Sequence, residues 1–168
     1  MLGGPITYGP VQLRVADCLI ALSALLGWPT VAGVTIGCFV GNIFYLPSLY
    51  GVFGSLALVD AIVGPIVNFI AASLVLLCRK RRLTACVIGA LTVGIIIGGY
   101  LWLMFLPPEI LGFLPMWIAS IVSITISSLI AIAVIGYSLL IILSRPKIIE
   151  PLKSRGLKVV KELMKQAN

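Results

Sequence analysis

The chain has 168 residues, of which 61% are hydrophobic and only 10% are charged. Soluble domains carry about 25% charged residues, so this composition excludes a soluble enzyme, and its hydrophobicity excludes intrinsic disorder. The net charge of +7 does not indicate nucleic-acid binding, because a chain this apolar offers no folded basic surface. A membrane-spanning helix needs about 20 apolar residues, so the length predicts an all-α polytopic membrane bundle of about five transmembrane helices.

Long uncharged stretches, interrupted by glycine and proline, predict the helices in chain order. The first helix is expected to end at Gly27 and Pro29, and the second at Pro47. These two are short for a bilayer, so we expect them to lie partly inside the bundle or where the membrane thins. The predicted helices cover residues 11–26, 30–44, 55–77, 83–106 and 116–143.

Basic residues mark the expected cytoplasmic side. One run, residues 79–82, joins the third and fourth helices, and seven of the 12 basic residues follow Leu143. The positive-inside rule therefore places both segments in the cytoplasm, and places the loop at 107–115 and the N-terminus outside. An odd number of helices after an exported start predicts either that a further helix precedes Met1 or that the chain inserts into the membrane in an unusual way.

The chain divides into a transmembrane part, residues 1–144, and a basic cytoplasmic tail, residues 145–168. Leu157, Val160 and Met164 recur at helical spacing in the tail, with lysines on the opposite face. This pattern predicts a short amphipathic helix that lies on anionic headgroups. Docking of this helix on a cytoplasmic partner is the alternative.

The residue types that build metal and cofactor sites are scarce. There is no histidine, and the four cysteines form no Cys-x-x-Cys pair. We therefore expect no metal and no cofactor. Only Asp17, Asp60 and Glu109 could serve as acids or bases in an intramembrane enzyme, and the motifs of membrane aspartyl proteases are absent, so the chain is not expected to be an enzyme.

Small residues recur at intervals of four on three predicted helices. Such stripes let helix backbones approach closely in lipid, which predicts packing inside the bundle. The stripe on the last helix is also the best candidate for docking on another membrane protein, because its hydroxyls could form hydrogen bonds across an interface. The three stripes are Gly33, Gly37 and Gly41; Gly94 and Gly98; and Ala119, Ser123, Ser127 and Ala131.

A few polar groups in the apolar helices are candidates for function, since charges inside a membrane are costly and usually serve a pair or a polar pathway. Arg14 and Asp17 are three residues apart and could form a pair, whereas Asp60 stands alone in its helix. With an amide and an aromatic ring, these groups converge on the predicted outer side, where they could hold a flat, polar molecule, either neutral or cationic. The predicted substrate-binding residues are Arg14, Asp17, Asn42, Asp60, Glu109 and Trp117.

Three segments, residues 9–17, 27–42 and 52–57, resemble the QueT family of queuosine precursor transporters, which are S components of energy-coupling-factor (ECF) transporters. Arg14, Asp17, Gly37, Asn42 and Gly54 match positions of the family pattern. The resemblance implies a membrane subunit that binds a 7-deazaguanine-type nutrient from outside, energised by a separate transmembrane subunit and two ATPases. The chain has no Gly-x-x-x-x-Gly-Lys-Ser/Thr motif for binding nucleotide phosphates, which agrees with ATP hydrolysis on separate subunits.

The sequence also departs from the family pattern. Family members begin with one more transmembrane helix, and they carry a Gly-Glu pair in the last helix where this chain has Ser127 and Ser128. Asp60 matches no family position. The alternative function is a small structural or assembly subunit, whose glycine and serine stripes pack on a partner and which binds no ligand.

Overall fold

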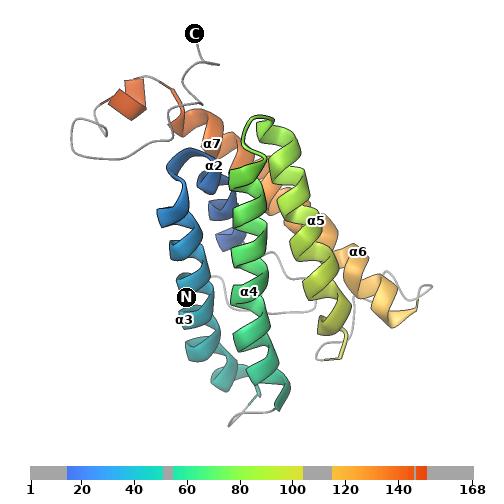
Figure 1. Cartoon of the computed structure of the whole chain (residues 1–168). Helices are drawn as coiled ribbons and strands as arrows, with labels where there is room; N and C mark the ends of the chain where they lie inside the picture. Colours follow the sequence, from blue (N-terminus) through green and yellow to red (C-terminus); the bar gives the residue numbers. More distant parts are fainter. Residues whose placement is uncertain (1–14, 51–54, 104–114, 146, 151–168) are drawn as a thin grey trace.

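The computed structural model describes residues 15–50, 55–103, 115–145 and 147–150. All the regular secondary structure in these ranges is helical, so the predicted all-α fold is confirmed for them. Three helices stand side by side, α3 (Trp28–Tyr50), α4 (Ser55–Leu77) and α5 (Arg82–Leu101) (Figure 1). Successive helices run in opposite directions, as their short connections require.

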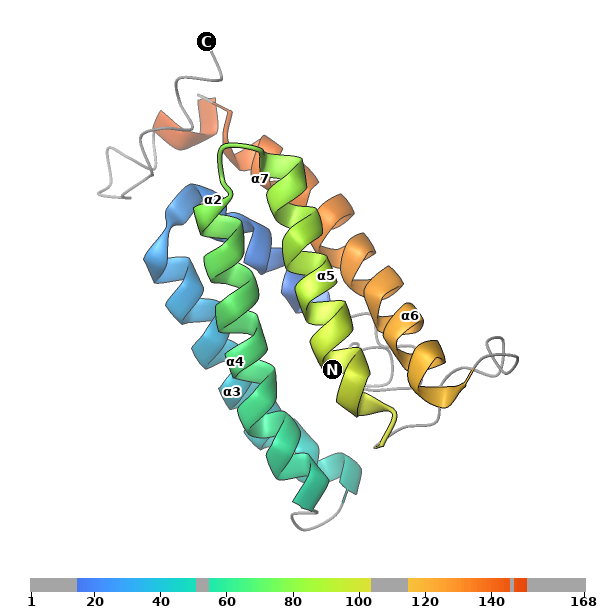
Figure 2. The ribbon, with the colours of Figure 1, turned by 45° about the vertical axis from the view of Figure 1, so that its right-hand side comes forward.

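The last helical rod packs along α5. It comprises α6 (Met116–Ser128), a π-helical segment η3 (Leu129–Gly136) and α7 (Tyr137–Leu143), and it crosses the bundle without a break (Figure 2). Both its ends and both ends of α4 agree with the predicted helices. The predicted tail, residues 145–168, lies mostly outside the described residues, so its amphipathic helix stays a prediction.

The first helix lies inside the bundle, as its shortness predicted. A 3-10 helix, η1 (Val15–Leu22), continues into the one-turn helix α2 (Ser23–Leu26), and residues 20–25 are buried. Ser23 Oγ lies 2.7 Å from the Ile20 carbonyl oxygen and 2.9 Å from that of Ala72, so its single proton is shared between this helix and α4. Gly27 then turns the chain into α3 with a φ of 77°, a conformation that favours glycine.

Two predicted helix ends are wrong. Pro47 does not end the second helix, because α3 continues through it to Tyr50, and α5 ends at Leu101 rather than at residue 106. Pro65 likewise lies inside α4. Proline removes one backbone hydrogen bond from a helix, but where no water can satisfy an opened backbone, helix continuation remains the better state.

Large apolar side chains cover the outside of the bundle. Phe44 and Leu77 are 80% and 74% exposed, which only a hydrocarbon solvent makes favourable. Three described helices are long and apolar enough to cross a bilayer, Val59–Leu77, Arg82–Leu101 and Met116–Leu143. The protein is therefore a multi-pass membrane protein.

Close helix contacts depend on two of the glycine positions predicted from spacing. A Cβ at Gly98 would lie 2.6 Å from the Ile121 Cα, and a Cβ at Gly94 would lie 2.6 Å from the Thr125 Cα. These distances are shorter than real Cβ contacts, so glycine is what lets α5 and α6 approach this closely. Ala119, Ser127 and Ala131 are also buried, which confirms inward packing for most of the last stripe.

The π-helical segment η3 packs against the buried first helix. A Cβ at Gly136 would lie 2.7 Å from the Cys18 carbonyl oxygen and 2.8 Å from the Ala21 Cβ. A π-helix is rare, so its presence implies a local requirement of the structure. Here that requirement is contact between η3 and η1, which fixes the position of η1 in the bundle.

We expect Gly98→Ala to lower the midpoint of thermal unfolding of the purified chain in detergent. The added methyl group overlaps Ile121, and overpacking of this kind costs about 1–3 kcal/mol. The neighbouring Gly99→Ala is the matched control, because a Cβ there meets nothing within 4 Å and alanine favours the helix. Equal midpoints for the two variants would contradict the inferred α5–α6 contact.

Candidate ligand-binding site

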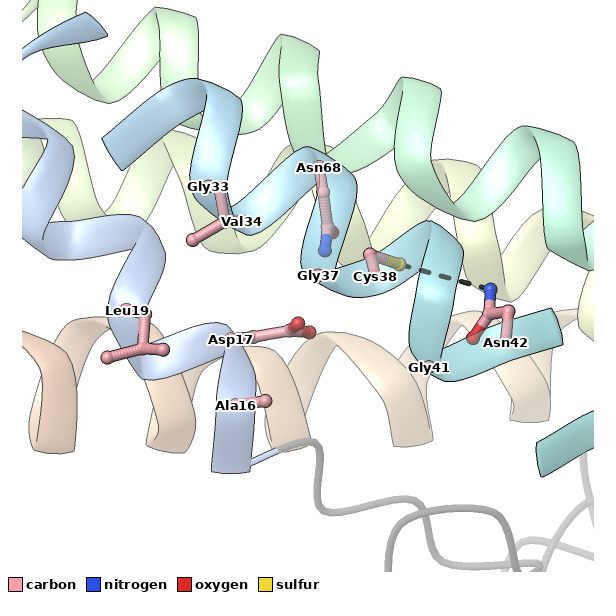
Figure 3. A pocket seen from close by; sticks show the side chains of 10 residues that line it. All are labelled: Ala16, Asp17, Leu19, Gly33, Val34, Gly37, Cys38, Gly41, Asn42 and Asn68. Atoms are coloured by element: carbon pink, nitrogen blue, oxygen red, sulfur yellow. Dashed lines mark hydrogen bonds between the residues drawn. The ribbon is translucent and has the colours of Figure 1, made fainter. Parts of the chain in front are cut away.

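A cavity of about 300 Å³ lies between η1, the middle of α3 and α4 (Figure 3). The volume is at the lower end of the range for small-molecule pockets. Its walls come from three elements that are distant in sequence. The lining residues are Ala16, Asp17, Leu19, Gly33, Val34, Gly37, Cys38, Gly41, Asn42 and Asn68.

Helical periodicity explains how α3 supplies most of the wall. Gly33, Gly37 and Gly41 recur every four residues, and Val34, Cys38 and Asn42 form the adjacent row with the same spacing. Residues four apart lie on one helix face, so both rows face the cavity. The glycine row leaves backbone rather than side chain at the cavity surface.

The predicted packing role of this glycine stripe is wrong for Gly33 and Gly37. A Cβ built at Gly33 or Gly37 would meet nothing within 4 Å, in contrast to Gly94 and Gly98. The spacing is the same in both stripes, but only the α5 stripe faces another helix at contact distance. The α3 stripe opens space instead of closing it.

Three buried polar side chains give the cavity its chemistry. Asp17, Asn42 and Asn68 are only 3%, 2% and 3% exposed. Figure 3 shows the Asp17 carboxylate and the Asn68 amide pointing into the space between η1 and α3. Among the described lining residues Asp17 is the only acid and none is basic, so the site favours a neutral or cationic ligand over an anion.

The Asn42 side chain is held in place by its neighbours. Its Nδ2 donates a hydrogen bond of 2.9 Å to the Asp60 carbonyl oxygen of α4 and lies 3.9 Å from the Cys38 Sγ. Gly64 makes this possible, because a Cβ there would lie 2.8 Å from the Asn42 Nδ2. The amide is thus fixed at the α3–α4 contact, with its Oδ1 left to the cavity side.

The Asp60 carboxylate has a hydrogen-bond partner, whereas the sequence suggested that it stands alone. It accepts a hydrogen bond of 2.5 Å from the Tyr100 hydroxyl of α5, and Asp60 is 8% exposed. Asp60 therefore joins three helices, through its carbonyl to α3 and through its carboxylate to α5. It stands behind Asn42 and does not line the cavity.

Asn68 lines the cavity but is not among the residues predicted from the sequence. Its Oδ1 is buried and has no hydrogen-bond partner among the described residues. The signal was present, since Asp60, Gly64 and Asn68 are four apart in an apolar helix and so share one face. A polar residue two turns from Asp60 indicates a polar face on this helix, which charged residues alone do not reveal.

The remaining predicted site residues do not join the cavity in the described part of the chain. Arg14 and Glu109 lie outside the described residues, so the expected Arg14–Asp17 pair stays a prediction. Trp117 is 52% exposed on α6 and does not line the cavity. Within the described ranges no group of three metal-ligating side chains occurs. One carboxylate and two amides suit hydrogen-bonded recognition of a small polar molecule.

Comparison with known proteins gives one finding. The family described as "QueT transporter" matches residues 1–145. No curated protein and no solved structure gives a significant match to the chain.

We expect Tyr100→Phe to destabilise the protein by about 1–3 kcal/mol, because it leaves the buried Asp60 carboxylate without this donor. Tyr137→Phe is the control, since the Tyr137 hydroxyl makes no hydrogen bond with the described residues. Thermal unfolding in detergent measures both. A similar loss in both variants would show that ring packing, not the bond to Asp60, is what matters.

Proposed function

The chain belongs to the QueT transporter family, and from this premise we propose that it is the substrate-binding subunit for uptake of a queuosine precursor of the 7-deazaguanine type. Energy would come from a separate ECF transmembrane subunit and ATPases. The cavity between η1, α3 and α4 is its binding site, and Asp17 and Asn42 are its main ligand contacts. The single observation that carries the proposal is the meeting of these two family-pattern residues, both buried, at one cavity.

The chemistry of the cavity supports this ligand class. A deazapurine base is flat and carries several N–H donors and a carbonyl acceptor on its edges. The Asp17 carboxylate accepts N–H bonds, and the Asn42 amide, fixed by Asp60, can accept a further one through Oδ1. The cavity of about 300 Å³ is large enough for a two-ring base without its sugar.

We propose that the ligand enters at the Asn42 end of the cavity, because Gly33, Val34 and Asn68 lie nearer the cytoplasmic ends of their helices. The basic run 79–82 connects α4 and α5, and the positive-inside rule assigns that end of the bundle to the cytoplasm. Asp60 and Tyr100 lie towards the opposite ends of α4 and α5. The polar contact of Asn42, Asp60 and Tyr100 therefore lies in the outer half of the bundle under this orientation.

A structural or assembly subunit without a ligand remains the competing function, and the structure offers it less support. A packing subunit has no need of a cavity that contains three buried polar side chains. The α6 stripe that was its main support is largely buried against the protein's own helices.

We expect a 7-deazaguanine base to raise the thermal midpoint of the purified full-length chain in detergent. A ligand at a hundred times its Kd stabilises by about 2.7 kcal/mol. Asp17→Asn keeps the side-chain size but removes the charge, and should weaken binding about tenfold to hundredfold, because hydrogen bonds to charged groups contribute about 1.5–3 kcal/mol.

Trp117→Phe is the control for that experiment, because Trp117 lies on the exposed face of α6. Cells that cannot make the precursor provide a second readout, the queuosine content of their tRNA when a base is supplied. Retention of full binding and uptake by Asp17→Asn would place the site elsewhere. An absence of any ligand effect in the wild type, with loss of partner association in Ser127→Leu, would favour the assembly subunit.

A further inference from the structure

We propose that Asn68 and the glycine row of α3 determine ligand specificity, the row by providing a flat floor for a planar ring and Asn68 by accepting a hydrogen bond from the ring edge. The proposal rests on the cavity being the substrate site. It adds a residue that the family resemblance does not assign, and it gives the glycines a role other than helix packing.

The first observation is the unsatisfied Asn68 Oδ1. The side chain is 3% exposed, points into the cavity, and its Oδ1 has no partner among the described residues. An unpaired acceptor in a membrane protein is unfavourable, and native structures rarely leave one without a reason. An N–H or O–H on a bound molecule would supply the missing donor.

The second observation is the empty space above two glycines. A Cβ at Gly33 or Gly37 would meet nothing within 4 Å, so no neighbouring helix requires glycine there. Glycine inside a helix is less stable than alanine, and this loss is not offset by close packing at these positions. The cavity itself offers a reason for glycine at these two positions, because alanine methyl groups would occupy the surface on which a planar ring could lie.

The two observations fit one ligand geometry. Figure 3 places Gly33 and Gly37 along one wall, with the Asn68 amide beside Gly37 and the Asp17 carboxylate across the space. A planar heterocycle lying on the glycine row would direct its edge at both polar groups. A molecule without a donor at the Asn68 position would leave that acceptor buried and unpaired, and would be rejected.

The glycine floor is tested by Gly37→Ala in the full-length chain in detergent. We expect the thermal midpoint without ligand to stay the same or rise, and the affinity for 7-deazaguanine to fall at least tenfold. Gly99→Ala is the matched control, because its Cβ also meets nothing within 4 Å but it lies outside the cavity. Unchanged affinity in Gly37→Ala would overturn the floor.

The role of Asn68 is tested with 7-deazaguanine and three analogues, each lacking one donor: the N1-methyl, N9-methyl and 2-deamino forms. One analogue should bind the wild type about tenfold to hundredfold more weakly because its lost donor faces Asn68. In Asn68→Leu that difference should disappear while the other differences persist. If all differences persist, Asn68 has only a structural role, for example by binding a buried water.

Cys38 provides a readout that does not depend on the substrate assignment. Its thiol lines the cavity, whereas Cys18 and Cys86 are buried, so Cys78→Ser leaves Cys38 as the only partly exposed described thiol. A bound planar base should slow its labelling by a maleimide. If 7-deazaguanine does not slow the labelling of Cys38 but guanine, adenine or pterin does, the proposed substrate is rejected and the planar-ring site is retained. Protection by none of them would overturn both.

Discussion

A polar side chain inside a bilayer has no water to bond with, so each one must find its partner within the protein. The described bundle is organised by this constraint. The Ser23 hydroxyl shares its proton between a carbonyl of its own helix and one of α4, and the Asn42 amide donates to a carbonyl of α4. Asp60 receives the Tyr100 hydroxyl from α5. Each bond joins helices that apolar contact alone would not align, because lipid is as apolar as the helix surfaces.

The same constraint distinguishes polar groups that have structural partners from those that are available to a ligand. The bonds of Ser23 and Asp60 account for their burial as structural contacts. The Asn68 Oδ1 has no such account in the described residues. Asn68 lines the cavity together with Asp17 and Asn42, so a ligand there would meet all three residues. The satisfied contacts thus form a rigid frame. Among the buried polar atoms without a partner in the described residues, which also include Ser73 Oγ and Thr125 Oγ1, the Asn68 Oδ1 belongs to a residue that lines the cavity.

Irregular helices create this room. Ordinary α-helices packed at glycine contacts would leave little space, as α5 and α6 show at Gly94 and Gly98. The first helix is instead a short 3-10 helix seated on a π-helical segment at Gly136. Because η1 packs against α3, α4 and η3, Asp17 in its first turn faces the middle of α3. The cavity occupies the space between them.

The sequence by itself determined the solvent, the fold class and most helix limits. Composition requires a bilayer, charge-free runs mark the helices, and Gly27 and Ser55 mark boundaries that the structure keeps. It also indicated Asp17 and Asn42. Only the tertiary structure decided which glycine stripe packs and which lines a cavity, because spacing defines a helix face but not what faces it. For the same reason Asn68 and Tyr100 gained their roles only when α4 was placed beside α3 and α5.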